Sequence, residues 1–354
     1  IVQAISDFCN KGAFGVMPNL LPLSFYPKAF LYKQGDSFSY EETANEIKKI
    51  PQINFVISAL PIEEEEEAYY DEPTSPYDGF KKAFARLELP SQMVSIEMQK
   101  KLKSSNGVYS LQNIALGILS KSGGIPWILE KPLDDVDCFI GLDVATKEKG
   151  IHYPACSVCL GAQGNLLKYY TTNIAQKGEK IDISTLEDIF NKILLAYKEN
   201  NNDNLPKHIV IHRDGISNED MNWYTQYFGK KNIQFDLVEI KKFVYRRLMD
   251  MSRQDASFDL NPSPGTAVIK GKEAFLVTTD VKAKLGAPQP IHLVHRYGIL
   301  PMEKIVKQIY VLSEIHTGSM KTSRLPLTTF YADKICKKHD CIPNNKLMRE
   351  LYFL

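Results

Sequence analysis

The segment CFIGLDVA, residues 138–145, decides the fold because it is an apolar run that carries one carboxylate, Asp143. It is followed by YPACSVCLGAQGNLLKYYT, residues 153–171, in which Gly164 and Asn165 form a hairpin signal between apolar stretches. A helical pattern then covers residues 184–198, with Ser184 as the expected N-cap. This region predicts successive strands joined by turns, followed by a helix.

The next apolar run, HIVIHRDG at residues 208–215, predicts a buried strand with Asp214 at its carboxyl end. That edge of the sheet is where α/β folds place their ligands. A helix near residues 218–228, a strand at 235–242 and a polar span follow, and a last helical region begins after Pro326. Strand, strand, helix and strand come in the order of the ribonuclease H fold.

The first third of the chain alternates apolar strands with helical patterns, which predicts a parallel α/β layer. These segments are residues 53–61, 77–89, 91–97 and 111–124. The stretch IPWILEKPLDDVD, residues 125–137, carries two prolines and three aspartates and is typical of a linker. With 354 residues and 44% hydrophobic content, the chain can bury two cores. We therefore expect two domains, with a boundary near Asp135.

Four acidic residues are candidates for metal chemistry: Asp143, Glu179 in QKGEKI, Asp214, and Asp333 in FYADKIC. Three of them sit in or beside apolar patterns, where a carboxylate is costly without positive charge nearby. A pair of divalent ions, Mg²⁺ or Mn²⁺, would supply that charge and could clamp the attacking and leaving oxygens of a phosphodiester. The hypothesis is a metal-dependent nuclease.

Simpler interpretations of these acids stay open. Asp143 alone is as well explained as a residue that caps a turn. Asp333 could form a salt bridge with Lys337, one helical turn later. Glu148 and Glu187 are alternatives to Glu179 as the fourth acid.

The first part of the chain carries a second set of polar residues. Tyr77 and Lys81 are four residues apart on a predicted helix and project from one face, Gln92 lies in PSQMV, and Lys121 ends a helix. Ammonium groups and an amide can neutralise a phosphate, and an aromatic ring can stack on a base. For Tyr77 and Lys81 alone, an amphipathic surface helix would explain the pattern.

Taken together, these motifs resemble the Argonaute family, of the prokaryotic type. GLDVA, KGEKI, HRDG and YADKI stand where its PIWI domain has an acidic tetrad, and LPLTTFYADKI resembles its final helix. The resemblance implies an α/β protein in which a Rossmann-like MID domain, residues 1–134 with an N-terminal lead-in, precedes a ribonuclease H-like PIWI domain, residues 135–354.

The resemblance also implies roles for the acidic residues. Asp143, Asp214 and Asp333 would be the metal ligands. Glu179 would complete the catalytic tetrad from a mobile loop that enters the site once guide and target are paired.

Tyr77, Lys81, Gln92 and Lys121 resemble the MID-domain set that holds the 5′-phosphate of a guide strand. The chain ends in ELYFL. In the family the C-terminal carboxylate, here that of Leu354, can join this pocket through a further metal ion.

The implied function is a guide-strand-directed endonuclease that takes a short DNA or RNA guide and cuts a complementary DNA or RNA target, in host defence. The alternative is a non-cleaving, guide-loaded binding module that acts with a partner effector. A guide-free nuclease is a third interpretation, against which the Tyr77 and Lys81 set argues. The chain begins with Ile1 rather than Met, so we expect upstream N and PAZ domains in the same protein.

Composition narrows the class of protein. The formal net charge of +1 excludes a uniformly basic, histone-like protein. No apolar run approaches ~20 residues, so no membrane span is expected. Six cysteines without a disulfide-like spacing favour a reducing cytoplasm. Cys156 and Cys159 would face opposite sides of a strand, which favours buried thiols over zinc ligands.

Overall fold

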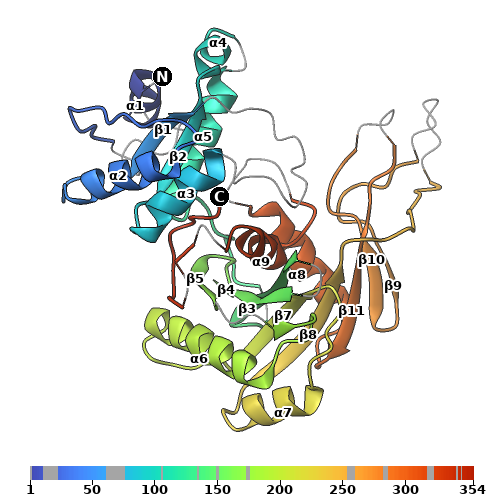
Figure 1. Cartoon of the computed structure of the whole chain (residues 1–354). Helices are drawn as coiled ribbons and strands as arrows, with labels where there is room; N and C mark the ends of the chain where they lie inside the picture. Colours follow the sequence, from blue (N-terminus) through green and yellow to red (C-terminus); the bar gives the residue numbers. More distant parts are fainter. Residues whose placement is uncertain are drawn as a thin grey trace.

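The computed structural model describes most of the chain, and Figure 1 shows how its elements are arranged. The described residues are 2–10, 23–60, 76–104, 107–133, 135–148, 151–172, 176–252, 260–281, 286–316, 323–339, 342–343 and 345–354. None of the helices within these ranges is long and apolar enough to cross a membrane.

The N-terminal region is a small parallel sheet with helices on both faces. Strands β1 (Val56–Leu60) and β2 (Ser91–Ser95) pair in parallel, as the alternating pattern predicts. The helices are α1 (Val2–Asn10), α2 (Ser37–Lys48), α3 (Pro76–Arg86), α4 (Met98–Leu102) and α5 (Gly107–Lys121). Successive residues of β2 face opposite sides: Met93 packs in a core with α2 and α3, and Val94 in a core with α1 and α5.

The rest of the chain builds one mixed sheet in the order β5-β4-β3-β7-β8-β11-β10-β9, with β6 paired to β4. Its strands are β3 (Cys138–Glu148), β4 (Ile151–Gly161), β5 (Leu166–Thr171), β6 (Gln176–Lys177), β7 (His208–Asp214), β8 (Gln234–Lys241), β9 (Ala267–Lys270), β10 (Glu273–Leu276) and β11 (Ile291–Tyr297). The β3–β7 and β7–β8 pairs are parallel and the others antiparallel. The predicted order of strands and helix around β3 and β7 is confirmed.

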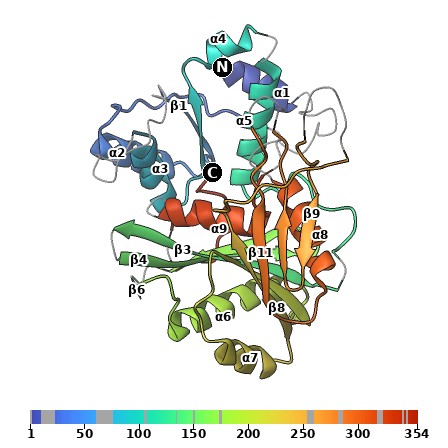
Figure 2. The same cartoon turned by 90° about the vertical axis from the view of Figure 1, so that its right-hand side faces the viewer.

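Helices cover both faces of this sheet. Helices α8 (Met302–Glu314) and α9 (Leu327–Lys337) lie on the face toward the N-terminal region, and α6 (Ile183–Asn200) and α7 (Met221–Gly229) lie on the other, as Figures 1 and 2 show. The sheet has one hydrophobic core on each face, and successive side chains of β3 point alternately into the two cores. Phe139 packs on the α9 side, and Ile140 and Leu142 pack on the α6 side.

Three details of the sequence-based prediction were wrong. The span between residues 242 and 325 is not simply polar, because it contains β9, β10, β11 and α8. Strands β9 and β10 have four residues each, which is too short to show a period, but Ile305 and Ile309 in α8 have clear helical spacing.

The other two errors concern helix starts. Helix α6 begins at Ile183, so Ser184 lies inside it and the N-cap is Asp182. Helix α7 begins at Met221 rather than near Asn218, because the Asp220 side chain accepts a hydrogen bond from the Asn222 N–H at 2.9 Å.

Residues 345–354 join the two sheets. Met348 exchanges main-chain hydrogen bonds of 2.8 and 2.9 Å with Tyr169 at the edge strand β5. Tyr352 and Phe353 are buried, and the chain then reaches Leu354 near β2 and α3, where the mark for the C-terminus stands in Figure 1. This C-terminal segment brings the end of the chain to the N-terminal sheet.

Candidate metal centre and anion pocket

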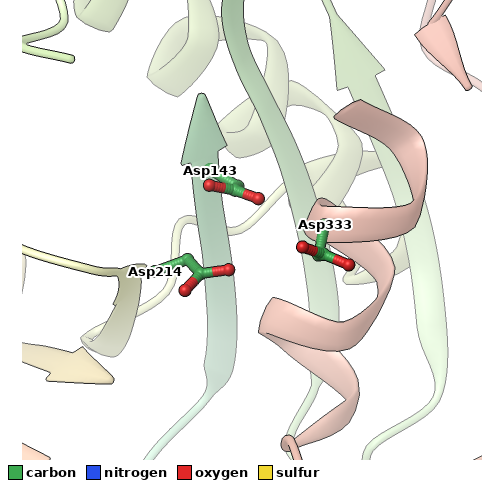
Figure 3. Close-up of side chains that lie close together, drawn as sticks. All are labelled: Asp143, Asp214 and Asp333. Atoms are coloured by element: carbon green, nitrogen blue, oxygen red, sulfur yellow. The ribbon is translucent and has the colours of Figure 1, made fainter. Parts of the chain in front are cut away.

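Asp143, Asp214 and Asp333 come together at one edge of the large sheet. Each offers one carboxylate oxygen, and these oxygens lie within 4.8 Å of one another. Figure 3 shows the three side chains side by side, from two strands and a helix. Because β3 and β7 are parallel with Leu142 opposite Arg213, the next residues, Asp143 and Asp214, are neighbours.

Asp333 reaches this edge because α9 lies unusually close to β3. A Cβ atom on Gly141 would lie 2.3 Å from the Thr328 carbonyl oxygen, so only glycine permits this packing. His212 in β7 also contacts α9, with Nδ1 2.8 Å from Thr328 Oγ1. The approach of α9 to the sheet therefore sets the position of the third carboxylate.

Basic side chains surround the three carboxylates. Lys242 Nζ lies 2.5 Å from Asp333 Oδ1 and also forms an ion pair with Asp214 Oδ2. Arg213 Nη1 lies 3.9 Å from Asp143 Oδ1. Lys337 Nζ lies 3.0 Å from Asp333 Oδ2, so the salt bridge considered as a simpler interpretation is present as well.

Burial and crowding separate the pKa values of the three acids. Burial, and then the nearby Asp214 charge, raise the pKa of Asp143 to about 8. Burial also raises the pKa of Asp214, against the attraction of Lys242. For Asp333, burial is outweighed by the hydrogen bond and charge of Lys242, and the pKa is lowered. The two strand aspartates therefore resist ionisation, while Asp333 is held in its charged form by the lysines beside it.

The donor set fits a hard divalent cation. All three candidate ligands are carboxylates, the oxygen donors that Mg²⁺ and Mn²⁺ prefer. Asp214 Oδ2 is buried and accepts no hydrogen bond of good geometry, although Lys242 forms an ion pair with it. A buried carboxylate oxygen in that state is a suitable metal ligand.

Glu179 lies apart from the three aspartates. Its side chain is exposed, and it does not belong to the acidic group found among the described residues. Its main-chain oxygen, however, accepts a 3.0 Å hydrogen bond from Arg213 Nη2. The buried Glu219 carboxylate contacts Arg213 Nε at 3.4 Å and accepts from the Ile181 N–H at 3.3 Å. The loop that carries Glu179 is thus tied to β7.

The predicted anion-binding residues also come together. Lys81 and Lys121 are only 4% and 5% exposed. Lys81 Nζ donates to the main-chain oxygens of Ser91, at 2.7 Å, and Leu354, at 3.0 Å. Lys121 Nζ donates to Gln92 Oε1 at 2.7 Å. Burial lowers the pKa of Lys121 to about 8.

Tyr77 lies beside Lys81, and three further residues, Lys338, Asp78 and Gly117, lie next to this group. The Tyr77 ring centroid lies 5.8 Å from Lys81 Nζ and 5.1 Å from Lys338 Nζ. Lys338 comes from the end of α9 and pairs with Asp78 at 2.5 Å. A Cβ atom on Gly117 would lie 2.6 Å from Gln92 Oε1, so glycine there leaves room for the amide.

Lys338 and Lys242 were not among the predicted site residues. Lys338 stands five residues after Asp333, at the end of the same predicted helix. Lys242 is the last residue of the predicted strand at 235–242. Lys338 could have been found from its place at the end of the helix that carries Asp333, whereas the place of Lys242 depends on how β8 packs beside β7.

A model of the Piwi domain matches residues 70–342 of the chain. Among curated proteins, the chain is 27% identical to "Protein argonaute" of Aquifex aeolicus over 348 residues, which is 95% of this chain and 44% of that protein. It is 25% identical to "Protein argonaute" of Thermus thermophilus over 252 residues, which is 71% of this chain and 34% of that protein.

Among solved structures, the chain is similar to Clostridium butyricum Argonaute bound to a guide DNA and a 19-mer target DNA. The TM-score is 0.89 and the identity 41%, and the match covers 100% of this chain and 48% of that one. Drosophila Piwi, at 19% identity and a TM-score of 0.72 over 100% of this chain and 48% of that one, shows the shared fold alone. The chain spans about half the length of the relatives it matches, or less.

Proposed function

Since this chain belongs to the Argonaute family through its Piwi domain, we propose that it is a guide-directed endonuclease. It anchors a 5′-phosphorylated guide strand and cleaves a complementary target by metal-dependent hydrolysis of a phosphodiester. One observation carries the proposal: three carboxylates from three separate elements lie within 4.8 Å of one another at a sheet edge.

The proposed metal ligands are Asp143, Asp214 and Asp333. Divalent ions held there would supply the positive charge that a cleaved phosphodiester needs at its attacking and leaving oxygens. Arg213 Nη1, 3.9 Å from Asp143, keeps that carboxylate oriented toward the centre. Glu179 completes the tetrad when its loop moves inward, and the bond from Arg213 to its main-chain oxygen holds the loop beside the site.

The anion pocket supports the guide-anchoring part of the proposal. Two ammonium groups, from Lys81 and Lys121, are buried beside an aromatic ring and an amide. A terminal phosphate would bind these ammoniums by charge-assisted hydrogen bonds, and the first base would stack on Tyr77. Leu354 approaches the same place through its main-chain oxygen, and a further cation could link its carboxylate to the phosphate.

The choice of nucleic acid follows the solved relative. Clostridium butyricum Argonaute was determined with a guide DNA and a target DNA, and it is 41% identical to this chain. We therefore propose a DNA guide and a DNA target as the first pair to test, with RNA as the other possibility for each strand. Sequence specificity would come from base pairing rather than from side chains that recognise bases.

The domain assignment is part of the proposal. We assign residues 1–134 to a MID domain and residues 135–354 to a PIWI domain, supported by the two separate sheets. The greater length of the relatives supports further domains in the same protein, which we propose are N and PAZ domains. Buried free thiols support a cytoplasmic location, where the protein would act in host defence; they are Cys9, Cys138, Cys159 and Cys336.

The experiment is cleavage of a labelled complementary DNA strand by the 354-residue chain, with a 5′-phosphorylated guide and Mn²⁺ or Mg²⁺. The matched variant is Asp214→Ala. We expect one cut at a fixed distance from the guide's 5′ end, and none with the variant, while guide binding survives. Cleavage that does not need the guide would contradict the proposal and support a guide-free nuclease.

The second candidate is a non-cleaving, guide-loaded binding module that acts with a partner effector. The exposed Glu179 side chain, apart from the three aspartates, is the observation that favours it. Under this alternative the protein binds guide and target tightly, no product forms with either metal, and Asp214→Ala changes neither result.

A further inference from the structure

The Lys242 side chain bridges two of the three clustered carboxylates. Its Nζ atom lies 2.5 Å from Asp333 Oδ1 and pairs with Asp214 Oδ2, so one ammonium joins the end of β7 to α9. The lysine side chain is 22% exposed, against 8% for Asp214 and 17% for Asp333. All three side chains are thus largely shielded from solvent, the lysine least of the three.

The main chain of Lys242 is fixed from another direction. Arg324 Nη2 donates to the Lys242 carbonyl oxygen, and Arg324 Nη1 donates to Gln289 Oε1 at 2.7 Å. Lys242 directly follows β8, and from the next residue the chain turns outward: Phe243 is 91% exposed. Any movement of the ammonium away from the aspartates is thus a rotation of the flexible lysine side chain, with the backbone held.

The ammonium and a divalent ion need the same oxygen atoms. Asp214 Oδ2 is buried, and Asp214 and Asp333 each offer an oxygen to the acidic group. The ammonium nitrogen that pairs with Asp214 Oδ2 and Asp333 Oδ1 already fills the space in which an ion bound to the same two oxygens would lie. Both cannot occupy the group in the arrangement described.

We propose that Lys242 is a placeholder cation, which holds Asp214 and Asp333 together in the metal-free protein and swings out when a divalent ion binds. The inference rests on the proposed function, because it takes the three aspartates as the metal site. It adds a positioning residue that competes with the metal, so that metal loading includes the cost of breaking two ion pairs.

Because Lys242 competes with the metal ion, Lys242→Met should have opposite effects on the stability of the metal-free protein and on metal affinity. Methionine is one atom shorter than lysine but keeps an unbranched, apolar stem, and it removes the charge. The metal-free variant loses the bridge between α9 and β7, so its midpoint of thermal unfolding in EDTA falls below that of the wild type. Its Mn²⁺ affinity rises, on the order of tenfold, because no ammonium has to be displaced.

The experiment measures Mn²⁺ binding by titration calorimetry and thermal unfolding with EDTA or Mn²⁺, on the full 354-residue chain. Lys337→Met is the matched control, because Lys337 pairs with Asp333 from an exposed position, 68% accessible. We expect a change in Mn²⁺ affinity of less than about threefold for this control. Asp214→Ala identifies which binding heat belongs to the acidic group.

Lys242→Arg tests the inference in the opposite direction and keeps it testable if the methionine variant does not fold. A guanidinium can hold two carboxylates through a planar pair of donors, so it should compete better and weaken Mn²⁺ binding.

Equal or weaker Mn²⁺ binding by Lys242→Met would overturn the inference. If instead the wild type and Asp214→Ala bind Mn²⁺ equally, the metal site of the proposed function fails. In that case a lower midpoint of thermal unfolding for Lys242→Met in EDTA would still show that the Lys242 ion pairs stabilise the metal-free protein.

Discussion

Gly141 in β3 lies against the main chain of Thr328 in α9, so closely that a Cβ atom there would come within 2.3 Å of the Thr328 carbonyl oxygen. This contact sets the distance between sheet and helix five residues before Asp333. Neither residue is a candidate ligand, yet together they decide where the third carboxylate lies.

Gly141→Ala should therefore damage both the fold and the acidic site. The added methyl group meets backbone rather than a flexible side chain, and overpacking of this kind typically costs about 1–3 kcal/mol. We expect a lower free energy of unfolding in urea, together with weaker Mn²⁺ binding, because α9 must shift. Gly229→Ala, with no atom within 4 Å of its Cβ, is the control and should be nearly neutral. An equal effect of both substitutions would contradict the role of the Gly141 contact.

Lys121→Met should stabilise the guide-free protein while it abolishes guide binding. Burial lowers the pKa of Lys121 to about 8, which means that the folded state disfavours its charge. This cost is fully present below pH 8 and disappears as the pH rises toward the unfolded value near 10.5. Removing the charge should add about 1–3 kcal/mol at pH 7, measured by urea denaturation.

Lys33 is exposed, and Lys33→Met is the control for this variant. It should change neither the free energy of unfolding nor guide binding. If Lys121→Met binds the guide with the wild-type dissociation constant, Lys121 does not contact the guide phosphate.

Asp236→Asn should make stability depend less on pH. Burial favours the neutral acid, but hydrogen bonds of 2.6 Å with His208 and 2.7 Å with His295 outweigh it and lower the pKa of Asp236 to about 2. That stabilisation is present above the unfolded pKa, roughly 4, and is lost as the pH falls toward 2. The hydrogen bond that His208 donates to Asp236 raises the pKa of His208, whose contribution is present below pH 6.5 and is lost as the pH rises through its folded value.

The free energy of unfolding of the wild type should exceed that of Asp236→Asn by about 2 kcal/mol between pH 4 and 6.5. Urea denaturation at several pH values from 2 to 8 measures how the free energy of unfolding of each protein depends on pH. Asp203→Asn, whose parent carboxylate is 86% exposed in a pair with Lys198, should follow the wild type. Parallel curves for wild type and Asp236→Asn would show that this network does not titrate as described.

Arg213→Lys should reduce cleavage far more than guide binding. The buried guanidinium donates to the main-chain oxygens of Asp214 and Glu179 and contacts Glu219, and a single ammonium cannot reach all three. The loop that carries Glu179 then loses its tie to β7. We expect a fall in the cleavage rate on the order of tenfold or more, with a guide dissociation constant within about twofold of the wild type.

Arg86→Lys, an exposed arginine paired with Glu41, provides the reference. If Arg213→Lys cleaves as fast as this reference, the tie between Arg213 and the Glu179 loop has no part in catalysis.

The aspartate group could be anticipated because its members carry local signals. Asp143 and Asp214 end or interrupt apolar strands, and parallel neighbours bring such residues to one edge. The anion pocket could be anticipated from Tyr77 and Lys81, which share a helix face. In each case the position of a residue within its own strand or helix already implies the direction in which its side chain points.

What the sequence did not reveal depends on contacts between distant elements. That Lys242 points at Asp333 follows from the packing of β8 against β7 and from the approach of α9, neither of which is written in local periodicity. The pairing of Asp236 with His295 spans two strands, one of which, β11, had been included in a polar span. Glu179 is a loop residue, and its relation to the site depends on Arg213 rather than on its own neighbours.

The contact between Lys81 and Leu354 also has a consequence in time. The two residues are 273 positions apart. At a synthesis rate of about 5–20 residues per second, Lys81 is made roughly 14–55 s before Leu354. During that interval the N-terminal sheet can form, but the contact that closes the pocket cannot. Under the proposed function, guide loading therefore waits until Leu354 has been made and the C-terminal segment has docked.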